Sequence, residues 1–262
     1  EKVPYAIVGG GAVGLAIAYE LSKSLDDIIL LIEKNKENEN GQLEGENQST
    51  RNSGVIHAGI YYPKKTQPLK AKFCVDGNRM LYEFCREHEV PHKKTGKLVV
   101  AADPREEEYL EMVHQRAIEN GVPDVKIING DKVKEYEPNV KSASALLLPT
   151  SGIIDSGSYV QKLYSLIKGA GNVINFQGHK VTEAKPKGEG FEVTTQSLDY
   201  TNSFETFETG VLINAAGLYS DEIAKMVNPD SSYTMSPIRG EATRFIKTKR
   251  ENIDMNGMNV YP

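Results

Sequence analysis

The sequence predicts an α/β fold in which a parallel sheet is interrupted by a second module. Three observations lead to this prediction. An apolar run at residues 3–8 continues directly into a glycine-rich turn, and a second apolar run at 28–32 follows one helix length later. A third run, 211–213, returns late in the chain after a mixed middle section. Short continuous apolar runs are typical of parallel strands buried on both faces.

The glycine-rich turn has the spacing Gly-x-Gly-x-x-Gly, formed by Gly9, Gly11 and Gly14, and Glu33 follows nineteen residues after the last glycine. Gly9 allows a tight turn, Gly11 lets backbone approach a pyrophosphate, and Gly14 lets the helix pack close to the strand. Free N–H groups and the helix dipole favour phosphate at this position. Glu33 is expected to bind a ribose and to repel a 2′-phosphate, which disfavours NADP. The pattern predicts a Rossmann-like dinucleotide-binding domain, and a βαβ unit that binds nothing is the alternative.

Composition describes an ordinary globular protein of 262 residues, with 39% hydrophobic and 26% charged residues. A formal net charge of −5 argues against nucleic acid or anionic lipid as the main partner. No apolar run approaches the roughly 20 residues of a membrane-spanning helix, so no transmembrane segment is expected. Glycines at 9–14 interrupt the first apolar run where a signal peptide would continue. The chain starts at Glu1, which leaves room for preceding residues, targeting signals included.

The remaining elements follow from periodicity and from turn residues. Residues 35–48 are polar and read as a loop. A helix beginning near Pro104 is expected to stop at Gly121. Helices are expected at 69–90, 104–120 and 158–168, and strands at 97–101, 173–176, 179–184 and 191–195. The last three strands, with a turn at 186–190, predict a β-meander before the chain returns to the buried strand 211–213.

Two cysteines occur, Cys74 and Cys85, and both fall in the helix expected at 69–90. Eleven residues separate them, which is about 16 Å along a helix axis. A disulfide needs far closer Cα atoms. Two buried thiols are therefore expected.

Segment 49–62 reads Ser-Thr-Arg-Asn-Ser-Gly-Val-Ile-His-Ala-Gly-Ile-Tyr-Tyr. Small hydroxyl residues and glycines allow backbone to approach a flat or phosphorylated ligand, and Arg51 and Asn52 supply donors. His57 lies among small residues, an arrangement expected to leave its ring accessible. Taken alone, a histidine is more often a core or surface residue than a catalytic one.

Segment 211–220 carries a strand into Asn-Ala-Ala-Gly, residues small enough for a cofactor or another backbone to lie against them. Close packing between two elements explains the same residues equally well.

Together these segments resemble the FAD-dependent oxidoreductases of the D-amino-acid oxidase and glycerol-3-phosphate dehydrogenase superfamily, and within it the L-2-hydroxyglutarate dehydrogenase (or oxidase) family. Residues 69–72, 96–101, 151–155, 215–221 and 237–241 add to the resemblance, which spans nearly the whole chain. Segment 52–62 is specific to the subgroup. The chain departs from it at Thr50-Arg51, where the family often has Gly-His; the arginine is closer to glycerol-phosphate relatives. Family members usually continue beyond this length, so a truncated chain lacking part of the substrate domain is expected.

The resemblance implies FAD as cofactor and assigns roles residue by residue. His57 is the implied base for the substrate hydroxyl proton, and Tyr62 and Arg239 are candidates for holding a substrate carboxylate. A structural Arg239 at the start of a strand is the alternative. Cofactor contacts are implied for Gly9, Gly11, Gly14 and Glu33 (ADP half), Ser49, Thr50, Arg51, Asn52, Ser53 and Gly54 (pyrophosphate, ribityl and ring), Val181 (adenine), and Ala215, Ala216, Gly217 and Leu218 (ribityl and diphosphate). No metal site is implied.

The implied reaction is oxidation of a 2-hydroxy acid, L-2-hydroxyglutarate foremost, with a quinone, oxygen or a flavoprotein as electron acceptor. A glycerol-3-phosphate, amino-acid or amine oxidoreductase and a non-catalytic dinucleotide-binding fragment are the alternatives. The implied location is the cytoplasm or mitochondrial matrix, with peripheral membrane contact possible. The expected fold is a Rossmann-like FAD-binding domain with a parallel sheet and a β-meander, at 1–90 and 151–232, interrupted by an α+β substrate domain at 91–150 and 233–262.

Overall fold

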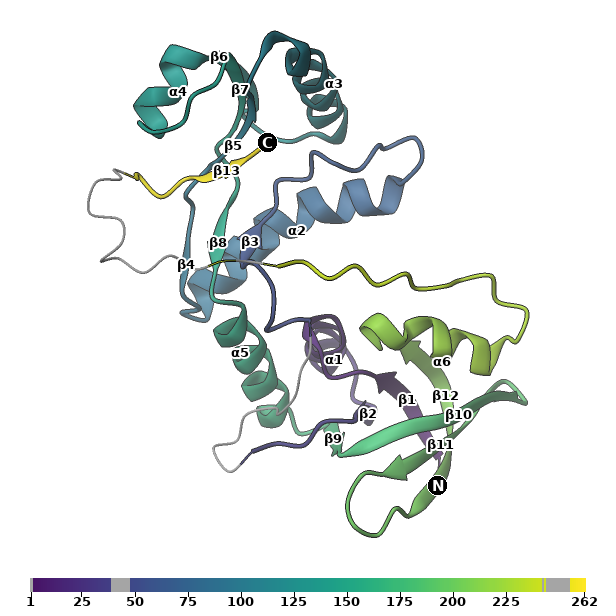
Figure 1. Ribbon diagram of the computed structural model, residues 1–262. Helices are drawn as coiled ribbons and strands as arrows, with labels where there is room; N and C mark the ends of the chain where they lie inside the picture. The colour runs from purple at the N-terminus through teal and green to yellow at the C-terminus, as the bar shows by residue number, and fades with distance from the viewer. Residues whose placement is uncertain (1, 39–47, 242, 244–254) are drawn as a thin grey trace. The chain divides into compact units, whose positions relative to one another are not determined.

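A computed structural model describes residues 2–38, 48–241, 243 and 255–262. The chain divides into two compact units (Figure 1). The first unit comprises Glu1–Asn52 and Ser156–Gly240, and the second comprises Ser53–Asp155 and Glu241–Pro262.

A six-stranded sheet with the order β10-β11-β12-β1-β2-β9 forms the centre of the first unit. Strand β1 pairs in parallel with β2 and β12, and β9 extends the parallel part beyond β2. The strands β10, β11 and β12 form an antiparallel meander. Their bounds are β1 Lys2–Val8, β2 Ile29–Glu33, β9 Val173–Gln177, β10 His179–Lys187, β11 Gly190–Ser197 and β12 Phe204–Asn214. The predicted parallel sheet with its meander is confirmed.

Helices cover both faces of this sheet. Helix α1 (Ala12–Ser24) packs beside α5 (Ser156–Gly169), and it buries Leu15 and Ala18 completely. A short 3₁₀ turn, η1 (Gly217–Tyr219), leads into α6 (Ser220–Val227), whose buried Ile223 joins Val8, Val181 and their neighbours in a core on the other face. The carboxyl end of β1 therefore lies next to the start of α1 and next to this apolar core. Open α/β sheets bind ligands at the carboxyl ends of their parallel strands.

The strand expected at 211–213 occupies the predicted central position, but its complete burial is wrong. It is the end of β12, between β1 and β11. Val211 is 43% exposed. The register pairs Val211 with Tyr5 and Ile213 with Ile7. Leu212 points to the other face of the sheet, where it packs in the core with Ile223. In the described residues, α1 covers that opposite face over β1 and β2 and leaves β12 partly uncovered.

The described residues of the second unit form two sheets and three helices. A four-stranded sheet has the order β13-β5-β7-β6, and a small sheet has the order β3-β8-β4. Their bounds are β3 Val55–Ile56, α2 Pro68–Glu87, β4 His92–Lys93, β5 Lys97–Ala101, α3 Pro104–Asn120, β6 Lys126–Asn129, α4 Gly130–Tyr136, β7 Ser144–Leu148, β8 Gly152–Ile154 and β13 Asn259–Tyr261. Side chains alternate in β5, so Val99 packs toward the α3 core and Leu98 packs toward α4 on the other face.

Helix α3 begins and ends where the sequence predicts. The Asp103 carboxylate accepts a hydrogen bond from Arg105 N at 2.8 Å, and Pro104 occupies the first turn. Gly121 ends the helix with a φ of +80°, a left-handed conformation that glycine adopts without strain. The helix buries Leu110 and Val113 against the sheet.

The compact units differ from the boundary expected at residue 90, because residues 53–90 belong with the second unit. Two long-range connections account for this. Val55 pairs with Ile153 across β3 and β8, and Tyr82 Oη of α2 donates to Thr150 O at 3.2 Å. Residues 151–155 likewise join the second unit, and 233–240 join the first.

Both cysteines lie on α2, as expected, and both are free. Cys85 is buried, whereas Cys74 is only half-buried. Burial raises the pKa of the Cys85 thiol to about 11, which keeps it protonated and unreactive at neutral pH.

Candidate functional site

The glycine turn and the small residues after β12 meet at the end of the sheet. Gly9 has a φ of +108°, and a Cβ added there would lie 2.4 Å from Ala215 O. A Cβ added at Gly14 would lie 1.9 Å from Gly9 O. Ala215 N donates to Val8 O at 2.9 Å. The backbones approach so closely that no larger residue fits at either glycine, and the two segments singled out by sequence form one structure.

Glu33 and Ser49 hold the turn in place. The Glu33 carboxylate accepts from Gly10 N at 2.6 Å and from Asn35 N at 2.8 Å. Ser49 Oγ accepts from Ala12 N at 2.9 Å, in the first turn of α1. The carboxylate therefore lies at the end of β2 beside the glycine turn, the position from which an acid reaches a ribose.

A pocket opens beside this turn, within the first unit. Four of the residues predicted to contact cofactor line it, namely Gly9, Glu33, Val181 and Ala216. The rest of the lining consists of Val8, Ile32, Lys34, His179, Lys180, Tyr219, Glu222, Ile223 and Met226. Apolar side chains from the sheet and α6 alternate with a few polar ones. Such a lining suits an adenosine, which presents a flat base and a polar sugar.

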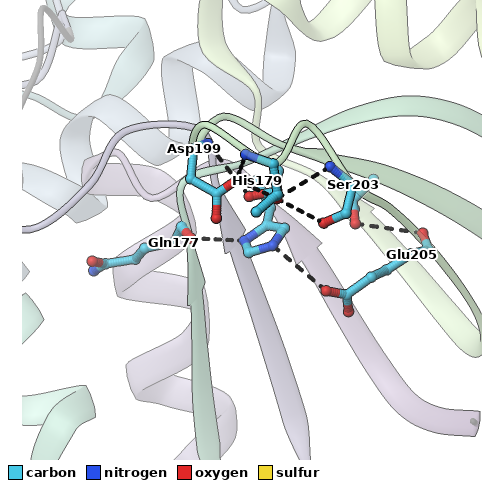
Figure 2. Close-up of polar contacts among 8 residues, drawn as sticks. Gln177, His179, Asp199, Ser203 and Glu205 are labelled. Carbon is cyan, nitrogen blue, oxygen red and sulfur yellow. Dashed lines mark hydrogen bonds and ion pairs between the residues drawn. The ribbon is translucent and has the colours of Figure 1, made fainter.

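His179 is a pocket residue that the sequence reasoning missed. Figure 2 shows its ring between Gln177 and Glu205: Nδ1 lies 2.7 Å from Gln177 O, and Nε2 lies 3.8 Å from Glu205 Oε1. The ring also stacks on Phe176, with centroids 3.7 Å apart. Strand alternation was the available signal, because residues two apart in a strand share a face, and His179 precedes Val181 by two.

Lys34 and Tyr219 were missed as well. Lys34 Nζ lies 3.9 Å from the centre of the Tyr219 ring, a cation–π contact at the pocket wall. Lys34 follows the predicted Glu33 directly, so its place at the strand end was the signal.

Other predicted residues of the first unit lie outside this pocket lining. Asn52 Nδ2 donates to Ser49 O at 2.9 Å and to Gln48 O at 3.0 Å, which closes the turn that carries Thr50 and Arg51. Gly217 opens η1 with a φ of +56°, and Leu218 is 39% exposed.

Arg239 is exposed and lies in a stretch, 231–241, whose described residues form no helix or strand. The alternative that placed Arg239 at the start of a strand stays untested, because residues 242 and 244–254, into which such a strand would continue, lie outside the described residues.

His57 belongs to the second unit, with Ser53, Gly54 and Tyr62. Gly54 has a φ of +64°, and a Cβ added there would lie 2.6 Å from Ile154 O. His57 is exposed between the buried Ile56 and Ala58. Partial burial of the imidazole lowers the pKa of His57, and the positive charge of Lys97 lowers it further. The neutral imidazole, the form able to accept a proton, is therefore favoured.

Lys97 is a buried cation that the sequence reasoning treated only as a strand residue. It is 1% exposed, and Nζ donates to Tyr61 Oη at 2.8 Å. The Tyr261 ring centre lies 3.5 Å from Nζ. Within the described part of the chain no carboxylate pairs with it, and burial lowers the pKa of Lys97 to about 8. Lys97 precedes the apolar Val99 by two residues and so shares its face of β5, which was the available signal.

Tyr62 is half-buried, and its carbonyl accepts from Asn120 Nδ2 at 2.9 Å. Lys70 Nζ lies 5.7 Å from its ring centre. Over the described ranges, no group of three His, Cys, Asp or Glu side chains is placed to hold a metal ion, and no helix has the length and apolar character to cross a membrane.

A family described as FAD dependent oxidoreductase (DAO) matches residues 4–261. The chain belongs to this family. Its curated relatives include the mitochondrial L-2-hydroxyglutarate dehydrogenase of Caenorhabditis elegans, 37% identical over 100% of this chain and 57% of the relative. The glycerol 3-phosphate dehydrogenase of Caloramator mitchellensis is 35% identical over 93% of this chain and 47% of the relative.

Solved structures agree on the fold. An L-alpha-glycerophosphate oxidase from Mycoplasma pneumoniae, in a dithionite-reduced form with FAD bound, superposes with a TM-score of 0.73 at 28% identity, covering 87% of this chain and 57% of that one. An L-proline dehydrogenase from P. horikoshii superposes with a TM-score of 0.71 at 21% identity, covering 88% and 57%. The chain thus spans about half the length of the relatives it matches.

Proposed function

We propose that the first unit binds FAD across the glycine turn and that the complete protein is an FAD-dependent dehydrogenase or oxidase of CH–OH donors. The observation that carries this is the cradle at Gly9, Gly14 and Ala215, where an added Cβ would collide with backbone, beside a pocket walled by Glu33. FAD is the cofactor of the family to which the chain belongs. The pocket accepts the adenosine, and the diphosphate lies against the backbone of the glycine turn at the positive end of the α1 dipole.

The individual cofactor contacts extend this proposal along the chain. Glu33 binds the adenosine ribose, and the backbone at Val181 holds the adenine. Ala215, Ala216, Gly217 and Leu218 lie against the diphosphate and ribityl chain, and Ser49, Thr50, Arg51, Asn52, Ser53 and Gly54 continue toward the ring. The second unit then serves as the substrate module.

His57 is proposed to remove the substrate hydroxyl proton. Its exposed position lets a substrate reach the ring, and its lowered pKa keeps the imidazole neutral near pH 7. Bound flavin supplies the hydride acceptor. Tyr62 and Arg239 are proposed to hold a substrate carboxylate, through a hydroxyl donor and a guanidinium.

The substrate proposed is a 2-hydroxy acid, with L-2-hydroxyglutarate first. Relatives named for that activity, at 35–37% identity over nearly all of this chain, support it. Glycerol 3-phosphate is the second candidate, favoured by the arginine at position 51 and by relatives named for that substrate. Mitochondrial names among the relatives favour a mitochondrial location. A quinone, oxygen or a flavoprotein completes the reaction as electron acceptor.

The test is anaerobic bleaching of the flavin-loaded full-length protein. L-2-hydroxyglutarate is expected to bleach the bound flavin, and glycerol 3-phosphate and amino acids are offered in parallel. A flavin that no 2-hydroxy acid bleaches would overturn the substrate proposal. His57→Gln is expected to bind FAD normally and to bleach at a rate lower by about 10²-fold or more.

A further inference from the structure

The backbone of His57 is held by an asparagine from a distant helix. Asn78 Nδ2, on α2, donates to His57 O at 2.9 Å and to Thr150 O at 3.0 Å. An amide nitrogen carries two hydrogens, so this group is fully used by two carbonyls. One of them is 21 residues away along the chain, and the other is 72 residues away.

The surrounding residues explain why this contact is needed. His57 is exposed between two buried neighbours, so the position of its ring depends on the backbone that carries it. Its neighbours are fixed: Ile56 pairs with Gly152 in the small sheet, and Gly59 lies so close to α2 that an added Cβ would approach Val75 Cγ2 to 2.6 Å. Between these two anchors, the His57 carbonyl is held by Asn78.

One face of α2 makes the contacts with Gly59, His57 and Thr150. Val75, Asn78 and Tyr82 are spaced by three and four residues, so they lie on one side of the helix. Val75 meets the loop at Gly59, Asn78 bridges His57 and Thr150, and Tyr82 Oη donates to Thr150 O at 3.2 Å. The helix thus joins the His57 loop to the turn before β8 through one rigid surface.

We propose that Asn78 is a positioning residue for His57: its amide fixes the backbone from which the exposed imidazole projects. The catalytic consequence rests on the proposed function of His57 as a base, whereas the positional claim does not. Fixing the backbone removes conformers that point the ring away from a substrate, and a displacement of about 1 Å at a reacting group can cost about 10²-fold in rate.

Asn78→Ala removes both donors, and Asn78→Ser is a milder variant that retains one hydroxyl donor. Asn172→Ala is the matched control, because Asn172 Nδ2 also bridges two carbonyls, Leu25 O at 2.8 Å and Asp27 O at 3.3 Å, but in the first unit. Each variant is labelled with ¹³C-histidine, and His57→Gln identifies the His57 resonance among the five histidines of the sequence.

The expected result is that the His57 resonance and its pH titration move in Asn78→Ala, move less in Asn78→Ser, and stay unchanged in Asn172→Ala. With flavin loaded, kcat is expected to fall about ten- to a hundredfold in Asn78→Ala, with KM for the proposed 2-hydroxy acid nearly unchanged. A His57 resonance and titration identical to wild type in folded Asn78→Ala or Asn78→Ser would overturn the proposal. Turnover of His57→Gln tests the base role separately, since an active variant contradicts that role and leaves the resonance result intact.

Discussion

Lys97→Met tests whether burial lowers the pKa of the Lys97 ammonium in the folded second unit. Burial lowers the pKa of Lys97 from 10.5 to about 8, which corresponds to about 3 kcal/mol between the two protonation states. Between those two pKa values the unfolded chain holds a proton that the folded protein has lost. The free energy of unfolding therefore rises with pH in that window.

From about pH 7 to about pH 9.5, this single group is expected to add about 2 kcal/mol to the stability of the wild type. Methionine does not titrate, so the variant lacks that rise. Comparing the difference between the two proteins cancels the groups they share. The variant also loses the bond to Tyr61 Oη at both pH values, which shifts its stability by a constant amount.

The assay is urea unfolding of both proteins, followed by circular dichroism, at about pH 7 and about pH 9.5. The stability of the wild type relative to Lys97→Met is expected to increase by about 2 kcal/mol between the two conditions. A difference that stays constant within about 0.5 kcal/mol would refute the reasoning, because Lys97 would then titrate alike in the folded and unfolded states.

Three further predictions concern the cofactor site and the base. The Cβ of Gly14→Ala would lie 1.9 Å from Gly9 O, so this variant is expected to lose about 1–3 kcal/mol of stability and to bind FAD more weakly in a fluorescence titration. Gly77→Ala is the control: Gly77 also lies in a helix but has open space around it, so this variant is expected to gain stability. Glu33→Ala leaves Gly10 N without its acceptor and is expected to raise the FAD Kd by about tenfold or more, whereas an unchanged Kd would contradict the ribose role. The acid limb of kcat/KM is expected below the usual histidine pKa of 6.5, because activity needs neutral His57 and the pKa of His57 is lowered. Lys97→Met removes a positive charge that lowers this pKa, so the limb is expected to move to higher pH. An acid limb above pH 6.5 in the wild type would contradict the assignment of His57 as the base.

Local spacing was enough to predict the glycine turn and α3. The turn depends on residues within one βαβ unit, and Gly9, Gly14 and Glu33 occupy the places that their spacing requires. Helix α3 likewise carries its own start and stop signals. The match is physical, because backbone clearance and capping are decided by residues close in sequence.

Long-range pairing could not be predicted. Strand β3 has two residues, too few for any periodicity, and its pairing with β8 joins Val55 to Ile153. That pairing places residues 53–90 in the second unit instead of the first. The burial of Lys97 and the position of Asn78 beside His57 depend on the same kind of contact. From the sequence, only the strand face of Lys97 and the helix face of Asn78 could be predicted.

The most direct test of the central claim is an FAD titration of the full-length protein stripped of flavin, with Gly14→Ala measured beside it. The wild-type protein is expected to be yellow as purified and, once stripped, to bind added FAD saturably and in preference to NADP. Gly14→Ala is expected to bind FAD more weakly. A correctly folded wild-type protein that stays colourless and takes up no FAD would contradict it.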